Sequence, residues 1–445
     1  MEKVNNKVYE NKLIILFFLT WGFLFIDRLA ISFVMPVIVP ELNISNTQVG
    51  IINMAFTIAW GVSAIVFSSI ADRLGNLKRW LLISGFLTAI FGAACALSTS
   101  FESLVLLRTL VGVAEGPFST FVMAMLGKSI SKDRLGFGVG VVNAGVSVVA
   151  ITLGPILLTQ LVAVTTWQMS FLVAASPGLI FMLIVWRFVK PVADERQAAA
   201  PESATEAAAA PSASAAPGTP GAPGAAPAAA SAPEKRKNMF AELWSYRNFR
   251  VCCILAATHM SGYYVMQIFA SLYWTNVANL DVQTMGFLIS GMGIFGIITS
   301  VALPKISDIY GRKPVMIIAY ILCILPSLSM FLWPGSTLSM VLYVLLAGLP
   351  GALGIFWINL IPIETLPPYL TSTGISIPMS MGEFIGGAAI TTFAGAIADA
   401  YGLPTMMIIV SIGFALSFLI CLPLIETAPR ALEKRALKES GEPAK

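Results

Sequence analysis

Long apolar stretches alternate with short polar segments along most of the chain. Each stretch holds roughly 20 or more mainly apolar residues, the length that a helix needs to cross a bilayer. The first six predicted spans are 13–38, 48–70, 80–98, 103–127, 136–159 and 167–189. The next six are 251–273, 284–304, 314–332, 338–361, 374–398 and 403–424. The pattern predicts an all-α membrane protein with about twelve transmembrane helices in two six-helix bundles.

A segment of different composition separates the two sets of spans. It is rich in Ala, Pro, Ser and Gly and has almost no large apolar residue. Such a segment cannot bury enough apolar surface to offset the entropy of ordering, so we expect it to be disordered. The predicted organisation is an N-terminal bundle at 1–190, a disordered Ala/Pro-rich linker at 191–238, a C-terminal bundle at 239–430 and a tail at 431–445.

Composition and charge agree with a bilayer environment. Hydrophobic residues make up 57% of the chain and charged residues only 11%, against about 25% charged residues in soluble proteins. Six alternate loops contain no Lys or Arg: 41–47, 98–102, 160–166, 274–283, 333–337 and 399–402. Basic residues outside the spans lie on the other side, which is cytoplasmic by the positive-inside rule. The sequence therefore predicts a multi-pass protein of the inner (plasma) membrane with both termini in the cytoplasm.

Several classes of function are disfavoured by the remaining residues. The five cysteines lie in apolar runs without a C-x-x-C pair, and only one His is present, so neither a disulfide framework nor a metal site is expected. The sequence has no Walker loop and no nucleophile elbow, so neither an enzyme nor a cofactor is predicted. The Lys and Arg form no basic face for nucleic acid. The expected partners are the lipid bilayer, a solute and protons, and we expect a monomer.

Four charged residues lie inside two of the predicted spans. Asp27 and Arg28 are adjacent in the first span, and Arg108 and Glu115 share one helix face in the fourth. A charge at the middle of a bilayer costs at least about 3 kcal/mol on insertion scales, so these residues indicate a function. Their charges balance, and we expect all four to face a shared central cavity.

An anionic solute would compete with the two carboxylates for the two arginines, because Arg binds carboxylate or phosphate through two parallel hydrogen bonds. Protonation of Asp27 or Glu115 would then free Arg28 and Arg108 for the solute, which couples a proton to an anion. The alternative is that two ion pairs only hold the first and fourth helices together.

Polar residues in the second half are further candidates. A polar helix face in lipid must point inward, so Tyr263, Tyr264 and Gln267 are predicted to line the pocket from the seventh span. Asn359 in the tenth span and Glu383 in the eleventh are also predicted to contact the solute. For Glu383 the alternatives are contact with an ion and a place in an ion pair. His259 shares the face of Tyr263, and a hydrogen-bonded histidine that packs between helices is favoured there over a proton relay.

The loops after the second and eighth spans repeat each other. Both place an Asp at the end of the span, a Gly three residues later and basic residues nearby. The first carries Asp72 and Arg73, and the second carries Asp308 and Arg312. Recurrence at the same point of two halves indicates an internal repeat, as in secondary transporters.

These loops resemble the G-x-x-x-D-R-x-G-R-R/K motif of the major facilitator superfamily, with Ser68 and Pro304 where the family usually has Gly. The resemblance covers nearly the whole chain apart from the linker. It implies two six-helix halves that rock about a central site, with Asp72, Arg73, Asp308 and Arg312 as latches that hold one state. Topology-setting charge and a tight turn remain the alternative interpretation.

Two longer patterns narrow the resemblance. Asp27-Arg28 before Leu-Ala-Ile-Ser, and Arg108-x-x-x-Gly-x-x-Glu115-Gly-Pro, resemble the first and fourth helices of the anion:cation symporter branch. That resemblance implies that Asp27 and Glu115 couple protons and that Arg28 and Arg108 bind an organic anion. Related patterns occur in spinster-type lipid transporters.

Three hypotheses follow. The first is a proton-coupled symporter of a small organic anion that works by alternating access. The second is a proton-coupled exporter of a lipid-like or drug-like amphiphile, which would use the same carboxylates but need a large apolar cavity. The third is a transporter-like sensor, which would need an interaction domain that the sequence does not provide.

Overall fold

The computed structural model describes residues 2–191, 239–428 and 432. It contains twelve helices long and apolar enough to cross a membrane, so the predicted all-α fold is confirmed. The protein is a multi-pass membrane protein. The predicted linker 191–238, apart from Pro191, and the tail 431–445, apart from Leu432, lie outside the described residues.

The first half forms six spans, of which the fifth is composite. Its helices are α1 (Glu2–Leu42), α2 (Asn46–Leu74), α3 (Leu77–Ala94), α4 (Phe101–Ser129), α5 (Lys132–Gly145), the π-helical segment η2 (Val146–Leu153), α6 (Gly154–Val164) and α7 (Trp167–Phe188). A short 3₁₀ turn, η1 (Cys95–Leu97), extends α3. Together α5, η2 and α6 make the fifth span, Gly138–Val164.

The second half begins with a short helix and then repeats the pattern. Its elements are α9 (Met239–Ser245), α10 (Arg247–Asn276), α11 (Val282–Tyr310), α12 (Arg312–Leu332), α13 (Thr337–Leu346), α14 (Leu349–Ile355), η4 (Phe356–Leu360), α15 (Ile361–Thr365), α16 (Pro368–Gly382), η5 (Glu383–Ile390), α17 (Thr391–Tyr401) and α18 (Pro404–Cys421). The segments η4 and η5 are π-helical. Such interruptions are frequent at functional sites, and η2 and η5 occupy the equivalent fifth and eleventh spans.

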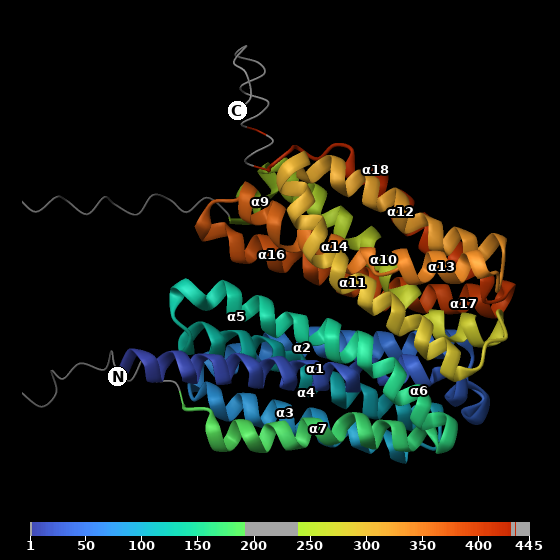
Figure 1. The fold of residues 1–445 in the computed structure, drawn as a ribbon, viewed down its shortest axis with the longest axis horizontal. Helices are drawn as coiled ribbons and strands as arrows, with labels where there is room; N and C mark the ends of the chain where they lie inside the picture. Colours follow the sequence, from blue (N-terminus) through green and yellow to red (C-terminus); the bar gives the residue numbers. More distant parts are fainter. Residues whose placement is uncertain (1, 192–238, 429–431, 433–445) are drawn as a thin grey trace, which may run out of the picture.

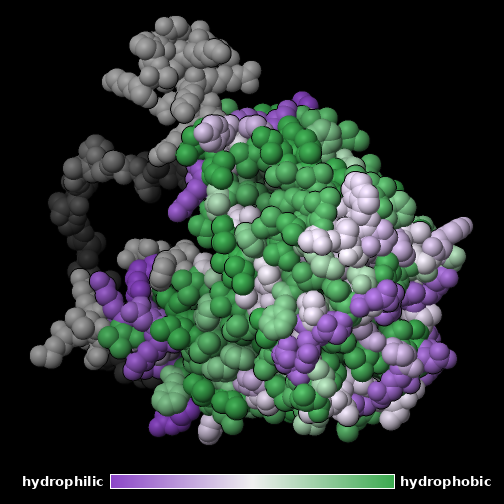
Figure 2. Space-filling model, turned by 45° about the vertical axis from the view of Figure 1, so that its right-hand side comes forward, coloured by the Kyte–Doolittle hydropathy of each residue, from purple (hydrophilic) through white to green (hydrophobic). Residues whose placement is uncertain are grey.

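The two halves lie against each other with their helices running lengthwise (Figure 1). The start of α1 lies at the left of this view, and we call this side the terminal end and the other side the opposite end. Polar residues gather toward both ends, and apolar residues cover the flank between them (Figure 2). Large side chains such as Ile180, Ile298 and Ile321 are exposed in the middle of their helices. An exposed apolar area of this extent is the surface that lipid covers.

Close backbone contacts join the halves at the opposite end. A Cβ on Gly395 of α17 would lie 2.2 Å from the carbonyl oxygen of Asn46, and a Cβ on Gly50 of α2 would lie 2.6 Å from Cα of Thr392. Only glycine allows two helices to approach in this way. The first turn of α2 is therefore packed directly against α17 across the two halves.

Asp399 of α17 adds a polar contact at the same place. Its carboxylate accepts hydrogen bonds from the backbone N–H groups of Asn46 and Thr47, both at 2.8 Å, and from both side chains at 2.9 and 2.5 Å. These N–H groups belong to the first turn of a helix, which lacks partners within the helix and favours negative charge. One half thus caps a helix of the other.

Replacing Asp399 with alanine should open the opposite end. The change removes four cross-half hydrogen bonds, and because Asp399 is exposed we expect the population of the closed arrangement relative to the open one to fall by about threefold to tenfold. The measurement is the distance distribution between spin labels on cysteines at Val164 and Tyr401, which are exposed residues of different halves at this end.

Asp281→Ala is the matched control. Asp281 is an acid at the same end, but it caps its own helix α11 through Thr284, whose hydroxyl and backbone N–H hold the pKa of this carboxyl below its usual value. It should leave the label distances unchanged. Equal distributions for the wild type and Asp399→Ala would show that Asp399 does not hold this end closed.

Candidate functional site

Two cavities meet near the middle of the molecule. The larger has a volume of about 390 Å³ and extends toward the terminal end, where Asn143, Ser300 and Met379 line it. The smaller, of about 40 Å³, extends toward the opposite end, where Val49 and Ile52 line it. Four residues line both cavities, and they form the partition between them: Arg28, Leu29, Tyr264 and Gln267.

Arg28 of α1 is the charged group of this partition. One guanidinium nitrogen lies 3.4 Å from Oε1 of Glu115, and the other lies 3.4 Å from the Tyr264 hydroxyl and 4.0 Å from Oε2 of Glu383. Charge-assisted hydrogen bonds are normally about 2.7–2.9 Å long. The guanidinium is therefore shared among three groups and held closely by none.

Aromatic rings surround the same guanidinium. Its central carbon lies 5.1 Å from the ring centroid of Phe25, 5.0 Å from that of Phe56 and 5.2 Å from that of Trp60. Cation–π attraction at such distances stabilises a guanidinium that is partly shielded from water. These rings hold Arg28 in place without competing for its hydrogen-bond donors, which make only long contacts of 3.4 Å with Glu115 and Tyr264.

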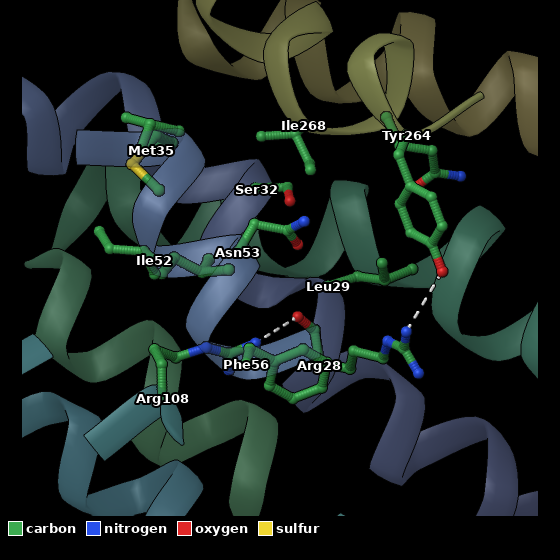
Figure 3. A pocket seen from close by; sticks show the side chains of 13 residues that line it. Arg28, Leu29, Ser32, Met35, Ile52, Asn53, Phe56, Arg108, Tyr264 and Ile268 are labelled. Atoms are coloured by element: carbon green, nitrogen blue, oxygen red, sulfur yellow. Dashed lines mark hydrogen bonds between the residues drawn. The ribbon is translucent and has the colours of Figure 1, made fainter. Parts of the chain in front are cut away.

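Tyr264 and Glu383 come from the other half and complete this network. The Tyr264 hydroxyl accepts from Arg28 and donates to the Glu383 carboxylate, whose two oxygens lie 2.9 and 2.8 Å away. Glu383 begins the π-helical segment η5 and is 7% exposed. Figure 3 shows the Arg28 side chain of α1 pointing to the Tyr264 hydroxyl of α10.

Arg108 of α4 lies on the other side of the Phe56 ring from Arg28. It donates to the backbone carbonyls of Asp27 at 3.3 Å and Arg28 at 2.9 Å, and Phe56 lies 4.9 Å from its central carbon (Figure 3). Two of its nitrogens are thus bound to the main chain of α1, whereas Nε has no hydrogen-bond partner among the described residues. Arg108 both lines the smaller cavity and fixes the backbone that carries Arg28.

Asp27 does not face either cavity, contrary to the prediction from sequence. It is fully buried against α3, where a Cβ on Gly92 would lie 2.3 Å from its carboxylate, and neither oxygen has a hydrogen-bond partner among the described residues. Adjacent residues of a helix point about 100° apart, so Asp27 and Arg28 cannot face the same side. Glu115 also lies outside both linings, and its Oε2 has no hydrogen-bond partner in the part of the chain that the structure describes.

Comparison with known proteins identifies the family. The Major Facilitator Superfamily model matches residues 14–390. The chain belongs to the major facilitator superfamily. The family expected from the two repeated loops is thus confirmed, and the protein is a transporter and not an enzyme.

Known members of the superfamily show what this one resembles. A hexuronate transporter of Bacillus subtilis is 30% identical over 196 residues, which are 44% of this chain and 46% of that protein. The match thus spans less than half the length of this relative.

Two solved structures share the fold. A bacterial homologue of the human lysosomal transporter Spinster, inward-facing and unoccupied, has a TM-score of 0.67 at 17% identity and covers 97% of this chain and 98% of its own. A D-xylose-proton symporter has a TM-score of 0.71 at 14% identity and covers 95% and 99%.

The remaining predicted residues of this major facilitator fall into two groups. Tyr263 and Gln267 line the larger cavity, and the Gln267 amide donates to the Tyr263 hydroxyl at 3.0 Å. Asn359 lies outside both cavities on the exposed side of η4, so its contact with a solute stays a prediction. His259 is buried 3.2 Å from the Tyr320 hydroxyl, as expected for a histidine that packs between helices.

One of the two predicted latches can be described. Arg312 lies 2.7 Å from Asp308 and 2.8 Å from Glu364, and Glu426 accepts from its backbone N–H at 2.7 Å. These contacts tie α11, α12 and α15 together within the second half. The side chains of Asp72 and Arg73 lie outside the described residues. Whether either pair gates transport stays a prediction.

Sequence reasoning missed several residues of the site. Phe56 carries no charge, and Gly92 matters only because it makes room for the Asp27 carboxyl. The hydrogen bonds that link Arg28 of the first half to Tyr264 and Glu383 of the second depend on how the two halves meet. A single sequence has no signal for that arrangement.

Proposed function

We propose that this transporter carries a small organic anion together with protons, and that the anion binds to Arg28 between the two halves. The observation that carries the proposal is the loosely shared Arg28 guanidinium on the wall of a large cavity. An arginine without a close ion-pair partner is a ready receptor for a carboxylate, which can bind it through two parallel hydrogen bonds. Arg108, on the adjoining smaller cavity, adds positive charge.

Charge in the site supports coupling to protons. Two arginines, Arg28 and Arg108, are accompanied by three acids, Asp27, Glu115 and Glu383, so an incoming anion adds to an excess of negative charge. Two like charges 4 Å apart repel by on the order of 4 kcal/mol at an effective dielectric constant of about 20. Protonation of Asp27 or Glu115 removes this repulsion. The carboxyl of Asp27 is fully buried and has no hydrogen-bond partner among the described residues. It fits a protonated group, since burial of an unpaired charge is costly.

The lining of the cavity supports a hydroxylated acid as the solute. Besides Arg28 it presents amide, hydroxyl and carboxylate groups from Gln267, Asn143, Ser147 and Glu383, and the flat ring of Trp60. These groups suit a sugar acid, whose carboxylate would pair with Arg28 while its hydroxyl groups bond to the others. The hexuronate transporter of Bacillus subtilis is a relative with this kind of solute.

The distribution of basic residues supports a cytoplasmic location for the terminal end. In that orientation the larger cavity extends toward the cytoplasm, and the contact of Asp399 with α2 closes the outer side. Alternating access would then require this contact to break, the halves to rock about Arg28 and the latches at Asp72 and Asp308 to close the inner side.

Uptake into proteoliposomes tests the proposal. A panel of sugar acids, aromatic acids, dicarboxylates and lysolipids is offered at an outside pH one unit below the inside pH, and again without a pH difference. We expect at least one small acid to accumulate only with the pH difference. Transport of lysolipids alone would instead support the amphiphile exporter.

A further inference from the structure

We infer that Glu383 is a proton carrier of the second half, which takes up a proton when the anion occupies Arg28 and so adds one proton to each transport cycle. The inference rests on the proposed function and deepens it. It assigns one role to Glu383, for which the sequence leaves open a contact with the solute or an ion and a place in an ion pair.

The position of Arg28 between two carboxylates is the first observation. Glu115 belongs to the same half as Arg28, and Glu383 belongs to the other. Their oxygens lie 3.4 and 4.0 Å from the guanidinium. By contrast, the Arg312 guanidinium lies 2.7 and 2.8 Å from its two partners. Among the described residues, Arg28 is the cation within 4.0 Å of Glu383. Its contacts are long enough for a ligand to replace them.

The surroundings of Glu383 are the second observation. The charged and titratable groups that face it are Arg28 of α1, Glu115 of α4, and Tyr263 and Tyr264 of α10. Arg28 is the one cation among them. Once an anion pairs with Arg28, Glu383 is left buried beside a second negative charge, and the Tyr264 hydroxyl is its one side-chain hydrogen-bond donor among the described residues. A buried carboxylate in that position takes up a proton.

The path for this proton is the third observation. Glu383 lines the larger cavity, which extends toward the terminal end, whereas Asp27 lines neither cavity. Glu383 can therefore exchange protons with the side toward which this cavity extends. Its proton also removes the attraction between Arg28 and Glu383, which joins the two halves at the partition.

The ratio of protons to anions tests the inference. Proteoliposomes are loaded with the anion identified in the uptake panel, the membrane potential is held at zero with potassium and valinomycin, and the pH difference that gives zero net flux is found. Each coupled proton supports about tenfold accumulation per pH unit. Glu383→Gln should lower the ratio by one proton per anion, which is about tenfold less accumulation at one pH unit. Glu383→Asp, which keeps the carboxyl, should keep the wild-type ratio.

Glu102→Gln is the control, because Glu102 is an exposed acid at the start of α4; it should leave the ratio unchanged. An unchanged ratio in Glu383→Gln would overturn the inference while leaving the proposed function standing. A wild type without any pH-dependent uptake would instead overturn the proposed function.

If Glu383→Gln does not turn over, the same point is tested by binding. Calorimetry in two buffers of different ionisation enthalpy gives the number of protons taken up when the anion binds the purified protein. Wild type should take up one proton more than Glu383→Gln. Equal numbers would overturn the inference.

Discussion

Replacing Arg28 with alanine is expected to lower the initial rate of anion uptake by about 100-fold or more. A hydrogen bond to a charged group contributes about 1.5–3 kcal/mol, and a carboxylate on a guanidinium makes two. The change also leaves Glu115 and Glu383 without the cation that lies between them. The measurement is the initial rate of uptake into proteoliposomes with acid outside.

Two variants separate loss of binding from loss of structure. Arg28→Lys keeps the charge but not the planar pair of donors, so its rate should lie between those of Arg28→Ala and the wild type. Arg187→Ala removes an exposed arginine near the end of α7, whose described contact is with the neighbouring Phe188 ring, and should transport normally. Normal uptake by Arg28→Ala would remove the basis of the proposed anion site.

Replacing Asp27 with asparagine is expected to lower the number of protons carried with each anion by at least one. The exchange of anion across the membrane at equal pH should be preserved. Asparagine has the size of the protonated carboxyl and fits the same space against Gly92, but it cannot release a proton. We expect accumulation of the anion at one pH unit to fall by about tenfold or more. Exchange of labelled for unlabelled anion at equal pH should stay within about twofold of the wild-type rate.

The exchange measurement is what makes the Asp27 result specific. A variant that is merely misfolded loses both accumulation and exchange of the anion. A variant that lacks a proton carrier loses accumulation but keeps exchange. Accumulation by Asp27→Asn at the wild-type level would show that Asp27 is not a coupling residue and would favour its alternative role in holding helices together.

The spans could be predicted from the sequence because the bilayer imposes both length and apolarity on each of them. The ends could not, since a helix continues past the apolar core: the first span was predicted at 13–38 and runs over Lys7–Leu42. Polar residues such as Lys7 lie in that extension. Their hydropathy does not predict a membrane span, but the backbone hydrogen bonds of the helix continue through them.

The site could be predicted in part for the same reason. Charge is rare inside a membrane, so Arg28, Arg108 and Glu383 were found from their type and position alone, and all three line the cavities. Asp27 and Glu115 do not line these two cavities, because balanced charges do not determine the side of a helix on which each residue lies. Asp399 could not be predicted, because acidic residues are common at the ends of spans. It becomes a helix cap only because α17 packs against the first turn of α2.

The most direct test of the account is whether the anion itself drives protons across the membrane. Proteoliposomes that hold a pH indicator, with equal pH on both sides, are exposed to the anion identified in the panel. The account predicts acidification of the interior on addition of the anion with the wild type, and none with Arg28→Ala. An anion that enters without any change of internal pH would contradict coupled transport.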